Sequence, residues 1–153
     1  AFLGKLSEKY TIHRCTPGAG GEFRAPGGAR PGMHLFRMYL GGEWYELIRP
    51  RNPVSAGLVP ALDVQVLQDM VLGPLLGIRE PRDDPRLQFV GGPMQAADLE
   101  ARVDRGEFAV AFSLRPIGIG EVMAVAAAGG ILPPKSTWFE PKLRSGLLIH
   151  PLD

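Results

Sequence analysis

The residues best suited to chemistry lie near the C-terminal end of the sequence. Lys135, Ser136, Thr137 and Lys142 place two ammonium groups and two hydroxyls within eight positions, in a stretch that prolines stiffen. Groups of this kind bind phosphate or carboxylate oxygens through charge-assisted hydrogen bonds. No acid or histidine nearby is placed as a general base, so catalytic residues stay unassigned. We therefore predict an anion-binding segment that acts by electrostatic positioning.

A structural role for the same segment stays open. The hydroxyls of Ser136 and Thr137 also fit a turn in which they bond to backbone groups and cap a short helix. The neighbouring aromatic pair Trp138-Phe139 fits a surface that docks a partner or a second copy of the chain. The segment is thus compatible with a ligand site, a turn or an interaction surface.

The acidic residues outside this segment are assigned to structure. Asp63 stands directly before an apolar stripe at helical spacing, so we predict that it caps that helix. Asp83 and Asp84 lie beside Arg82 in a charged turn, where solvated side chains are usual. A metal site needs more converging oxygen ligands than this pair provides, so no metal ligand is predicted.

The hairpin aromatics and the single cysteine are assigned to structure as well. Tyr39, Trp44 and Tyr45 have the side chains that stack nucleobases in single-strand binders, but they divide between the two faces of a predicted hairpin. We therefore predict that they pack in the core. Cys15 has no second cysteine to pair with, which excludes an intramolecular disulfide. It is predicted to be a structural thiol beside a strand.

The composition favours one domain and gives no argument for a nucleic-acid or membrane partner. Of the 153 residues, 45% are hydrophobic and 22% are charged, and the formal net charge is +1. This balance creates no strong field of one sign. The longest nearly uncharged run, 116–134, is broken by Glu121 and by glycines, so it is not a membrane span. No secretory leader is visible, and the expected location is cytoplasmic.

The apolar pattern alternates between helical and strand-like periods. Helical spacing predicts helices at 2–9, from Asp63 to an interruption near residue 72, between Pro93 and Gly106, and at 121–128. Alternation predicts strands at 10–15, 34–40, 43–49, 86–90, 108–114 and 147–150. The Gly/Pro-rich stretch 16–32 predicts a flexible loop. The whole chain, 1–153, is therefore expected to be a single α+β domain, with helices packed on a mainly antiparallel or mixed sheet.

Two strand patterns are specific enough to predict side-chain placement. Gly41-Gly42 predicts a two-residue hairpin turn. Pairing outward from this turn predicts the partners Tyr39 with Trp44, Arg37 with Glu46, Leu35 with Ile48, Met38 with Tyr45, and Phe36 with Leu47. In the later strand one face is bulky and is predicted to line the core: Phe108, Val110, Phe112 and Leu114.

Several motifs resemble the C-terminal region of the domain-of-unknown-function 1015 (DUF1015) family. The resemblance covers roughly residues 35 to 153, and the proline-rich segment is its most specific part. The motifs that carry it are Leu62-Asp63-Val64, Pro74-Leu75-Leu76-Gly77-Ile78, Phe89-Val90-Gly91-Gly92, Ala109-Val110-Ala111-Phe112-Ser113-Leu114, and Leu132-Pro133-Pro134-Lys135-Ser136-Thr137-Trp138-Phe139-Glu140-Pro141-Lys142 followed by Ser145-Gly146-Leu147.

The resemblance implies a role that depends on a further part of the protein. Members of the family are longer, and their N-terminal part carries a Gly-His-His-Arg stretch that resembles the ParB-like nucleotide-handling motif of free serine kinases. This chain opens at Ala1 without a methionine, and its three histidines are scattered at His13, His34 and His150. We therefore expect a C-terminal fragment without the catalytic motif.

Two functions are expected, the first from this resemblance and the second from the aromatic residues of the hairpin and of Trp138-Phe139. In the first, the chain is a support and ligand-binding domain that completes an anion or nucleotide site of a ParB-like, kinase-like N-terminal part. Its partners would then be that missing domain and a phosphate-containing small molecule, and no cofactor is assigned. In the second, the chain is an interaction or homo-oligomerisation module without catalytic activity.

Overall fold

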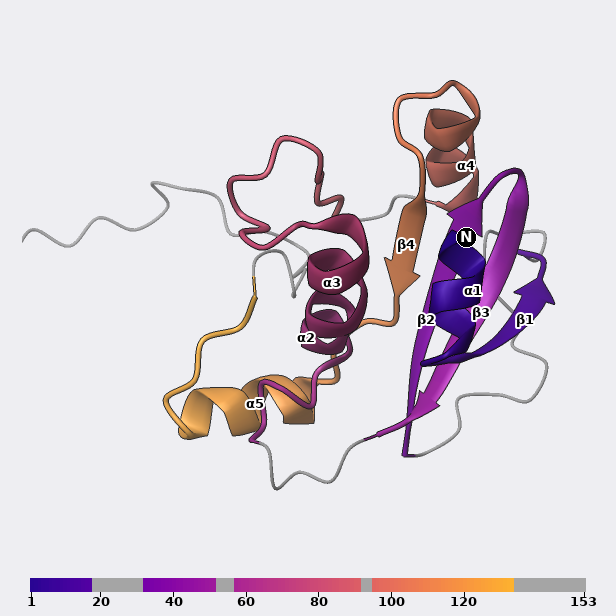
Figure 1. The fold of residues 1–153 in the computed structure, drawn as a ribbon. Helices are drawn as coiled ribbons and strands as arrows, with labels where there is room; N and C mark the ends of the chain where they lie inside the picture. Colours follow the sequence, from indigo (N-terminus) through magenta and orange to yellow (C-terminus); the bar gives the residue numbers. More distant parts are fainter. Residues whose placement is uncertain (18–31, 52–56, 92–94, 134–153) are drawn as a thin grey trace, which may run out of the picture.

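A computed structural model of the chain describes residues 1–17, 32–51, 57–91 and 95–133. Within these residues four strands form one antiparallel sheet in the order β1-β3-β2-β4 (Figure 1). The strands are β1 (Thr11–Cys15), β2 (Met33–Leu40), β3 (Glu43–Pro50) and β4 (Ala111–Leu114). Helices pack against this sheet, so the predicted α+β class with a mainly antiparallel sheet is confirmed.

The hairpin between β2 and β3 has the predicted turn and register. All five predicted cross-strand pairs occur, from Tyr39 with Trp44 beside the turn to Leu35 with Ile48 near its open end. Gly41 and Gly42 adopt φ angles of 59° and 82°, in the left-handed region that a type I′ turn requires at both positions. Local turn chemistry therefore fixes which side chains share each face of the sheet.

Helices pack on both faces of the sheet, and Figure 1 shows the helical segments of the described residues. They are α1 (Phe2–Ser7), α2 (Asp63–Leu67), the π-helical turn η2 (Gln68–Leu72), α3 (Gly73–Leu76), α4 (Ala96–Asp104) and α5 (Ile119–Ala127). The residues of α1, α2 and η2 pack on the face that carries Phe36, Met38 and Leu47. Helix α4 packs on the opposite face.

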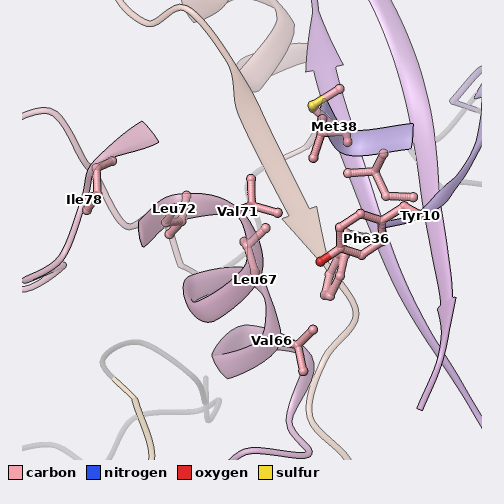
Figure 2. Packing of buried hydrophobic residues seen from close by; sticks show 10 residues of the cluster. Tyr10, Phe36, Met38, Val66, Leu67, Val71, Leu72 and Ile78 are labelled. Carbon is pink, nitrogen blue, oxygen red and sulfur yellow. The ribbon is translucent and has the colours of Figure 1, made fainter. Parts of the chain in front are cut away.

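The main core lies between the sheet and the helices α1 and α2. Phe36, Met38 and Leu47 are fully buried there, and Tyr10 meets the ring of Phe36 edge-on (Figure 2). Val66 from α2 and other side chains from η2 reach the same cluster: Val71 and Leu72. Burial of this apolar surface is the main force that fixes the helices on the sheet.

A second cluster confirms that Tyr39 and Trp44 of the hairpin are structural, and Tyr45 packs against the main core. Tyr39 and Trp44 are buried beneath α4 and contact Ala96. The Tyr39 hydroxyl donates to Asp104 at 3.0 Å, and the indole N–H of Trp44 donates to Glu100 at 2.6 Å. Both polar groups are therefore satisfied by the helix that covers them, and neither ring is open for nucleobase stacking.

The interruption predicted near residue 72 takes the form of the π-helical turn η2. Pro74 has no N–H group, so the carbonyl of Met70 cannot receive the usual bond from four residues later. The Lys9 ammonium donates to that carbonyl at 3.3 Å instead. The helix then continues through α3 and ends at Gly77, whose φ is 71°. Proline therefore widens this helix rather than ending it at once.

Two strand predictions need correction. Residues 86–90 form no strand, because Arg86 bonds to the carbonyls of Leu76 and Gly77 and to the Asp84 carboxylate, which holds the segment at the end of α3. The hydrogen bond from Arg86 also lowers the pKa of Asp84. The pairing in β4 begins only at Ala111. The strands predicted earlier in the chain, at 10–15, 34–40 and 43–49, match β1, β2 and β3 closely.

The bulky face predicted for 108–114 is only partly buried. Val110, Phe112 and Leu114 pack against the main core but keep intermediate exposure. Phe108 lies before β4, and the guanidinium of Arg102 sits 4.8 Å from its ring centre. The direction of this face was thus predicted correctly, whereas its depth was overestimated. The strand predicted at 147–150 and nearly all of the loop 16–32 lie outside the described residues.

Candidate functional site

The anion-binding segment predicted from the sequence lies outside the described residues. Lys135, Ser136, Thr137 and Lys142 all belong to it, so their role stays a prediction. The described residues contain a different group of charged side chains that converges on one buried carboxylate. This group of charged side chains forms the candidate site.

Asp63 is the centre of this group and does not cap its helix. It is only 9% exposed, and α2 begins without a side-chain capping bond, with Leu62 in the N-cap position. One carboxylate oxygen, Oδ1, accepts a hydrogen bond from His34 Nδ1 at 2.7 Å, and the other accepts from Arg115 Nη2 at 3.3 Å. The predicted capping role is therefore wrong, because the cationic and imidazole donors of the strands take the carboxylate instead.

The antiparallel sheet explains why these donors meet. The start of β2 lies beside the end of β3 and the end of β4. His34 is near the start of β2, and Arg51 and Arg115 each follow directly after the last residue of β3 and β4. Backbone and side-chain bonds fix both arginines: Arg51 N–H donates to Gly32 O at 2.8 Å, and Arg115 Nη2 lies 3.5 Å from Met33 O. The start of α2 then brings Asp63 to the same end of the sheet.

Arg51 connects Asp63 to a second carboxylate, from α5. Its Nη2 lies 3.6 Å from Asp63 Oδ1, and its Nη1 donates to Glu121 Oε1 at 3.2 Å. The other oxygen of Glu121 accepts the backbone N–H of Gly118 at 3.1 Å, which holds the glutamate at the start of α5. Arg51 therefore links α2, α5 and the end of β3 through one guanidinium group.

A pocket of about 170 Å³ opens between these groups. Its charged wall is formed by Arg51, Arg115, Asp63 and Glu121, and its apolar wall is formed by Leu62, Pro116 and Ile117. The volume is close to that of a cavity that holds one benzene molecule. The pocket therefore fits a small organic acid or the anionic end of a larger ligand.

The pocket combines two guanidinium groups with two carboxylates, and of the carboxylates Asp63 is the buried one. The side chains of Arg51 and Arg115 keep 32% and 28% of their surface exposed, whereas the Asp63 side chain keeps 10%. Arg115 Nε is buried and has no hydrogen-bond partner among the described residues. Asp63 thus holds both arginines in place, while part of each side chain remains exposed.

His34 occupies the innermost position of the site. Only 1% of it is exposed, and its ring stacks on Phe36 with 6.3 Å between the ring centres. A carboxylate only accepts hydrogen bonds, so Nδ1 carries the hydrogen that is donated to Asp63. His34 Nε2 is buried without a partner among the described residues. In the neutral ring this nitrogen holds a lone pair.

Other reactive groups give no sign of catalysis in the described part of the chain. Burial, with the nearby Glu46 carboxylate adding to it against Arg37, raises the pKa of the Cys15 thiol to about 11. The thiol therefore stays protonated and unreactive at neutral pH, as predicted for a structural cysteine. Among these residues no three His, Cys, Asp or Glu side chains are grouped so as to hold a metal ion.

The fold and site thus define an α+β domain with a charged pocket at one end of its sheet. Comparison of the chain with protein-family models, curated proteins and solved structures gave no match in any of the three. In the part of the chain that the structure describes, none of the helices has the length and apolar character needed to cross a membrane.

The sequence contained a signal for this site that its motifs did not reveal. In the predicted register, His34 shares the inward face of β2 with Phe36 and Met38. A histidine at such a position needs a polar partner, because an unpaired buried polar group is costly. Asp63, the acid at the start of the next helix, is that partner.

Proposed function

We propose that this chain is a ligand-binding domain whose pocket receives an anionic group of a small molecule. The observation that carries the proposal is the pair Arg51 and Arg115, which Asp63 holds in place while both remain accessible at the pocket. A guanidinium group presents parallel N–H donors that match carboxylate and phosphate oxygens. The apolar wall of Leu62, Pro116 and Ile117 would cover the carbon skeleton of the ligand.

Stability alone does not account for this arrangement. A buried ion pair is seldom more stabilising than apolar side chains of similar volume, because both charges lose their hydration. Ligand binding gives the exposed part of both arginine side chains at the pocket an explanation.

The proposal extends to the wider protein that the family resemblance implies. If the chain is a C-terminal part of a DUF1015 protein, the domain would complete an anion or nucleotide site of a ParB-like, kinase-like N-terminal part in the cytoplasm. Lys135, Ser136, Thr137 and Lys142 would then supply further anion contacts. The partners of the domain would be that N-terminal part and a phosphate-containing small molecule.

Calorimetry with simple anions tests the proposal. We would titrate the chain with sulfate, inorganic phosphate and acetate at low ionic strength, and compare Arg115→Ala and Arg51→Ala with Arg105→Ala. Arg105 is a matched control because it is an exposed arginine that pairs with Glu107. Each pocket variant should lower affinity at least about tenfold, which corresponds to one lost charged hydrogen bond.

The stability of each variant must be measured beside its affinity. Arg115→Lys keeps the charge but loses the fork, so it should bind acetate more weakly while its thermal melt stays near that of the parent chain. Lys135→Ala belongs in the same series, and a lower melting temperature with unchanged binding would make its segment a structural turn. Equal affinity in all variants and in the Arg105→Ala control would refute the proposed pocket.

A second function is favoured by the exposed apolar surface of α5. Ile119 and Met123 are each 65% exposed, and Ile131 beyond the helix is 79% exposed. An interaction or homo-oligomerisation module would bury such a surface against a partner or a second copy. Sedimentation of the parent chain and of Met123→Glu distinguishes this function, because only an apolar contact between copies would be broken by the new charge. A parent chain that is monomeric at high concentration would exclude the contact between copies.

A further inference from the structure

We propose that the ligand of this pocket is a zwitterion, a small aliphatic α-amino acid whose carboxylate and ammonium groups are bound by different side chains. This inference rests on the proposed function and names the class of molecule that carries the anionic group. Its basis is the charged wall, in which the carboxylates of Asp63 and Glu121 line the pocket together with two arginines. The wall therefore offers acceptors for a cation as well as donors for an anion.

The two carboxylates of the wall differ in exposure, and Glu121 is the one that a ligand can reach. The Asp63 side chain keeps only 10% of its surface exposed, whereas that of Glu121 keeps 38%. Each oxygen of Glu121 accepts one bond, Oε1 from Arg51 and Oε2 from the backbone N–H of Gly118. An ionised carboxylate has about four acceptor positions, so Glu121 can also accept a bond from a ligand ammonium group.

The two arginines differ in a corresponding way, and Arg115 is the expected partner of the ligand carboxylate. Arg51 uses both of its terminal nitrogens, with Nη1 bonded to Glu121 and Nη2 beside Asp63. Arg115 contacts Asp63 and the carbonyl of Met33 through Nη2 alone. Among the described residues Nη1 of Arg115 makes no bond, and it can therefore donate to a ligand oxygen.

The balance of charge in the wall favours a zwitterion over a simple anion. Two guanidinium groups and two carboxylates together contribute no net charge to the pocket. A simple anion would gain the donors of Arg115 but would lie near the carboxylate of Glu121, and this repulsion is stronger in a poorly hydrated pocket than in water. A zwitterion brings one charge of each sign, so each charge that leaves water meets an opposite charge.

The apolar wall sets the size and character of the rest of the ligand. Leu62, Pro116 and Ile117 form this wall, and none of their side chains has a hydrogen-bond donor or acceptor. The volume of about 170 Å³ is close to that of a cavity of ~150 Å³ that holds benzene. A compact aliphatic side chain such as that of valine therefore suits the pocket.

Calorimetry on the parent chain with three ligands of the same carbon skeleton tests this inference. We would titrate L-valine, isovalerate, which lacks the ammonium group, and isobutylamine, which lacks the carboxylate, at neutral pH and low ionic strength. Valine should bind at least about tenfold more tightly than either of the other two, because each of them loses one charged hydrogen bond. This comparison requires no variant to fold.

A variant assigns the preference for valine to Glu121. Glu121→Gln keeps an acceptor for the backbone N–H of Gly118 but removes the negative charge. The affinity for valine should fall about tenfold, whereas the affinity for isovalerate should stay equal or rise because the repulsion is gone. Glu107→Gln is the matched control, since Glu107 is an exposed glutamate that also pairs with arginines, and it should keep the preference of the parent chain. Equal weakening of both ligands in Glu121→Gln would overturn the inference.

NMR of the parent chain locates the ammonium group. Valine should shift the amide resonance of Gly118, which donates to Glu121, more than isovalerate does. The amide of Gln95 donates to Asp98 in the same way at the start of α4, so its resonance should stay unchanged. Bound valine that leaves Gly118 unshifted would overturn the inference.

The ligand series also separates this inference from the proposed function. Isovalerate that binds as tightly as valine would overturn the zwitterion and leave the anion pocket standing. Isobutylamine that binds as tightly as valine, with no binding of isovalerate, would refute the anion pocket and the zwitterion together. The absence of binding by all three ligands would likewise refute both.

Discussion

Replacement of Asp63 by asparagine separates a helix cap from an ion cluster. Asparagine caps helices as well as aspartate does, so a capping role predicts almost no loss of stability. The structure predicts a large loss, because the buried carboxylate bonds to His34 and Arg115 and lies beside Arg51. The asparagine amide would retain an acceptor for one of these donors but would remove the negative charge that balances the two cations.

The magnitude follows from the burial of the groups involved. Removal of one partner from a fully buried ion pair costs about 3–5 kcal/mol. The two arginines keep roughly a third of their surface in solvent, with 32% and 28% exposed, so water recovers part of that cost. We therefore expect Asp63→Asn to lower the free energy of unfolding by about 2–3 kcal/mol. In urea this corresponds to a midpoint shift of about 1 M or more for a chain of this size.

Urea unfolding followed by tryptophan fluorescence measures this loss. Asp69→Asn is the control, because Asp69 lies on the same helical segment, is exposed, and accepts a bond from Gln65 one turn earlier. It should change stability by less than about 0.5 kcal/mol. A loss below about 1 kcal/mol for Asp63→Asn, together with a larger loss for Asp63→Ala, would show that capping dominates and that the ion cluster adds little.

Three further predictions test the fold and the cysteine. Phe36→Ala should cost about 3–5 kcal/mol in urea unfolding and Phe112→Ala roughly half as much, because Phe36 is fully buried and Phe112 only partly so; equal losses would contradict the packing described above. Valine at Gly41 or Gly42 should cost at least about 1–2 kcal/mol per site, since both φ angles are positive, and an unchanged melt would exclude the turn. Cys15 should react slowly with a thiol reagent at pH 7, and its rate should climb as pH rises toward about 11; rapid labelling at neutral pH in the folded chain would contradict its raised pKa.

The pH dependence of stability that Cys15 contributes has a definite sign. Its pKa is raised from 9.0 to about 11 in the folded chain, so folding favours the neutral thiol. The stabilisation is complete below the unfolded value and is lost as pH rises from about 9 toward 11. The thiol therefore contributes nothing to any change of stability with pH below about 8.

Local signals were sufficient for the hairpin and insufficient for the strands that depend on distant partners. Gly41-Gly42 fixes the turn, and the side-chain period of two then fixes every pair along β2 and β3. Residues 86–90 have a strand-like composition, yet Arg86 bonds to the end of α3 and the segment pairs with nothing in the described sheet. A strand exists only where a neighbour accepts its backbone hydrogen bonds, and sequence alone does not show that neighbour.

The site was missed for a related reason. His34 and Asp63 are 29 positions apart, and the two arginines are separated by more than 60 positions in the sequence. Only the antiparallel order of the strands brings the start of β2 and the ends of β3 and β4 to one place. The prediction at Lys135 was guided by the spacing of residues within a short motif. Such spacing gives no information about contacts between residues that are far apart in the sequence. The inward-facing position of His34 was the available clue.

Asp63 could accept hydrogen bonds from two kinds of donor, the backbone N–H groups of its helix or charged side chains, and the sequence indicates only the first kind. An acid before an apolar helical stripe predicts a cap, because exposed helix starts leave backbone N–H groups unpaired. Here the helix start is packed against the sheet, and the donors that reach the carboxylate are His34 and two arginines. Charged donors form stronger hydrogen bonds than neutral backbone amides do, so they take the carboxylate when the fold delivers them. An acidic residue at the start of a helix is therefore a candidate centre for an anion pocket when the helix begins beside the ends of several strands. Its sequence context alone would predict only a cap.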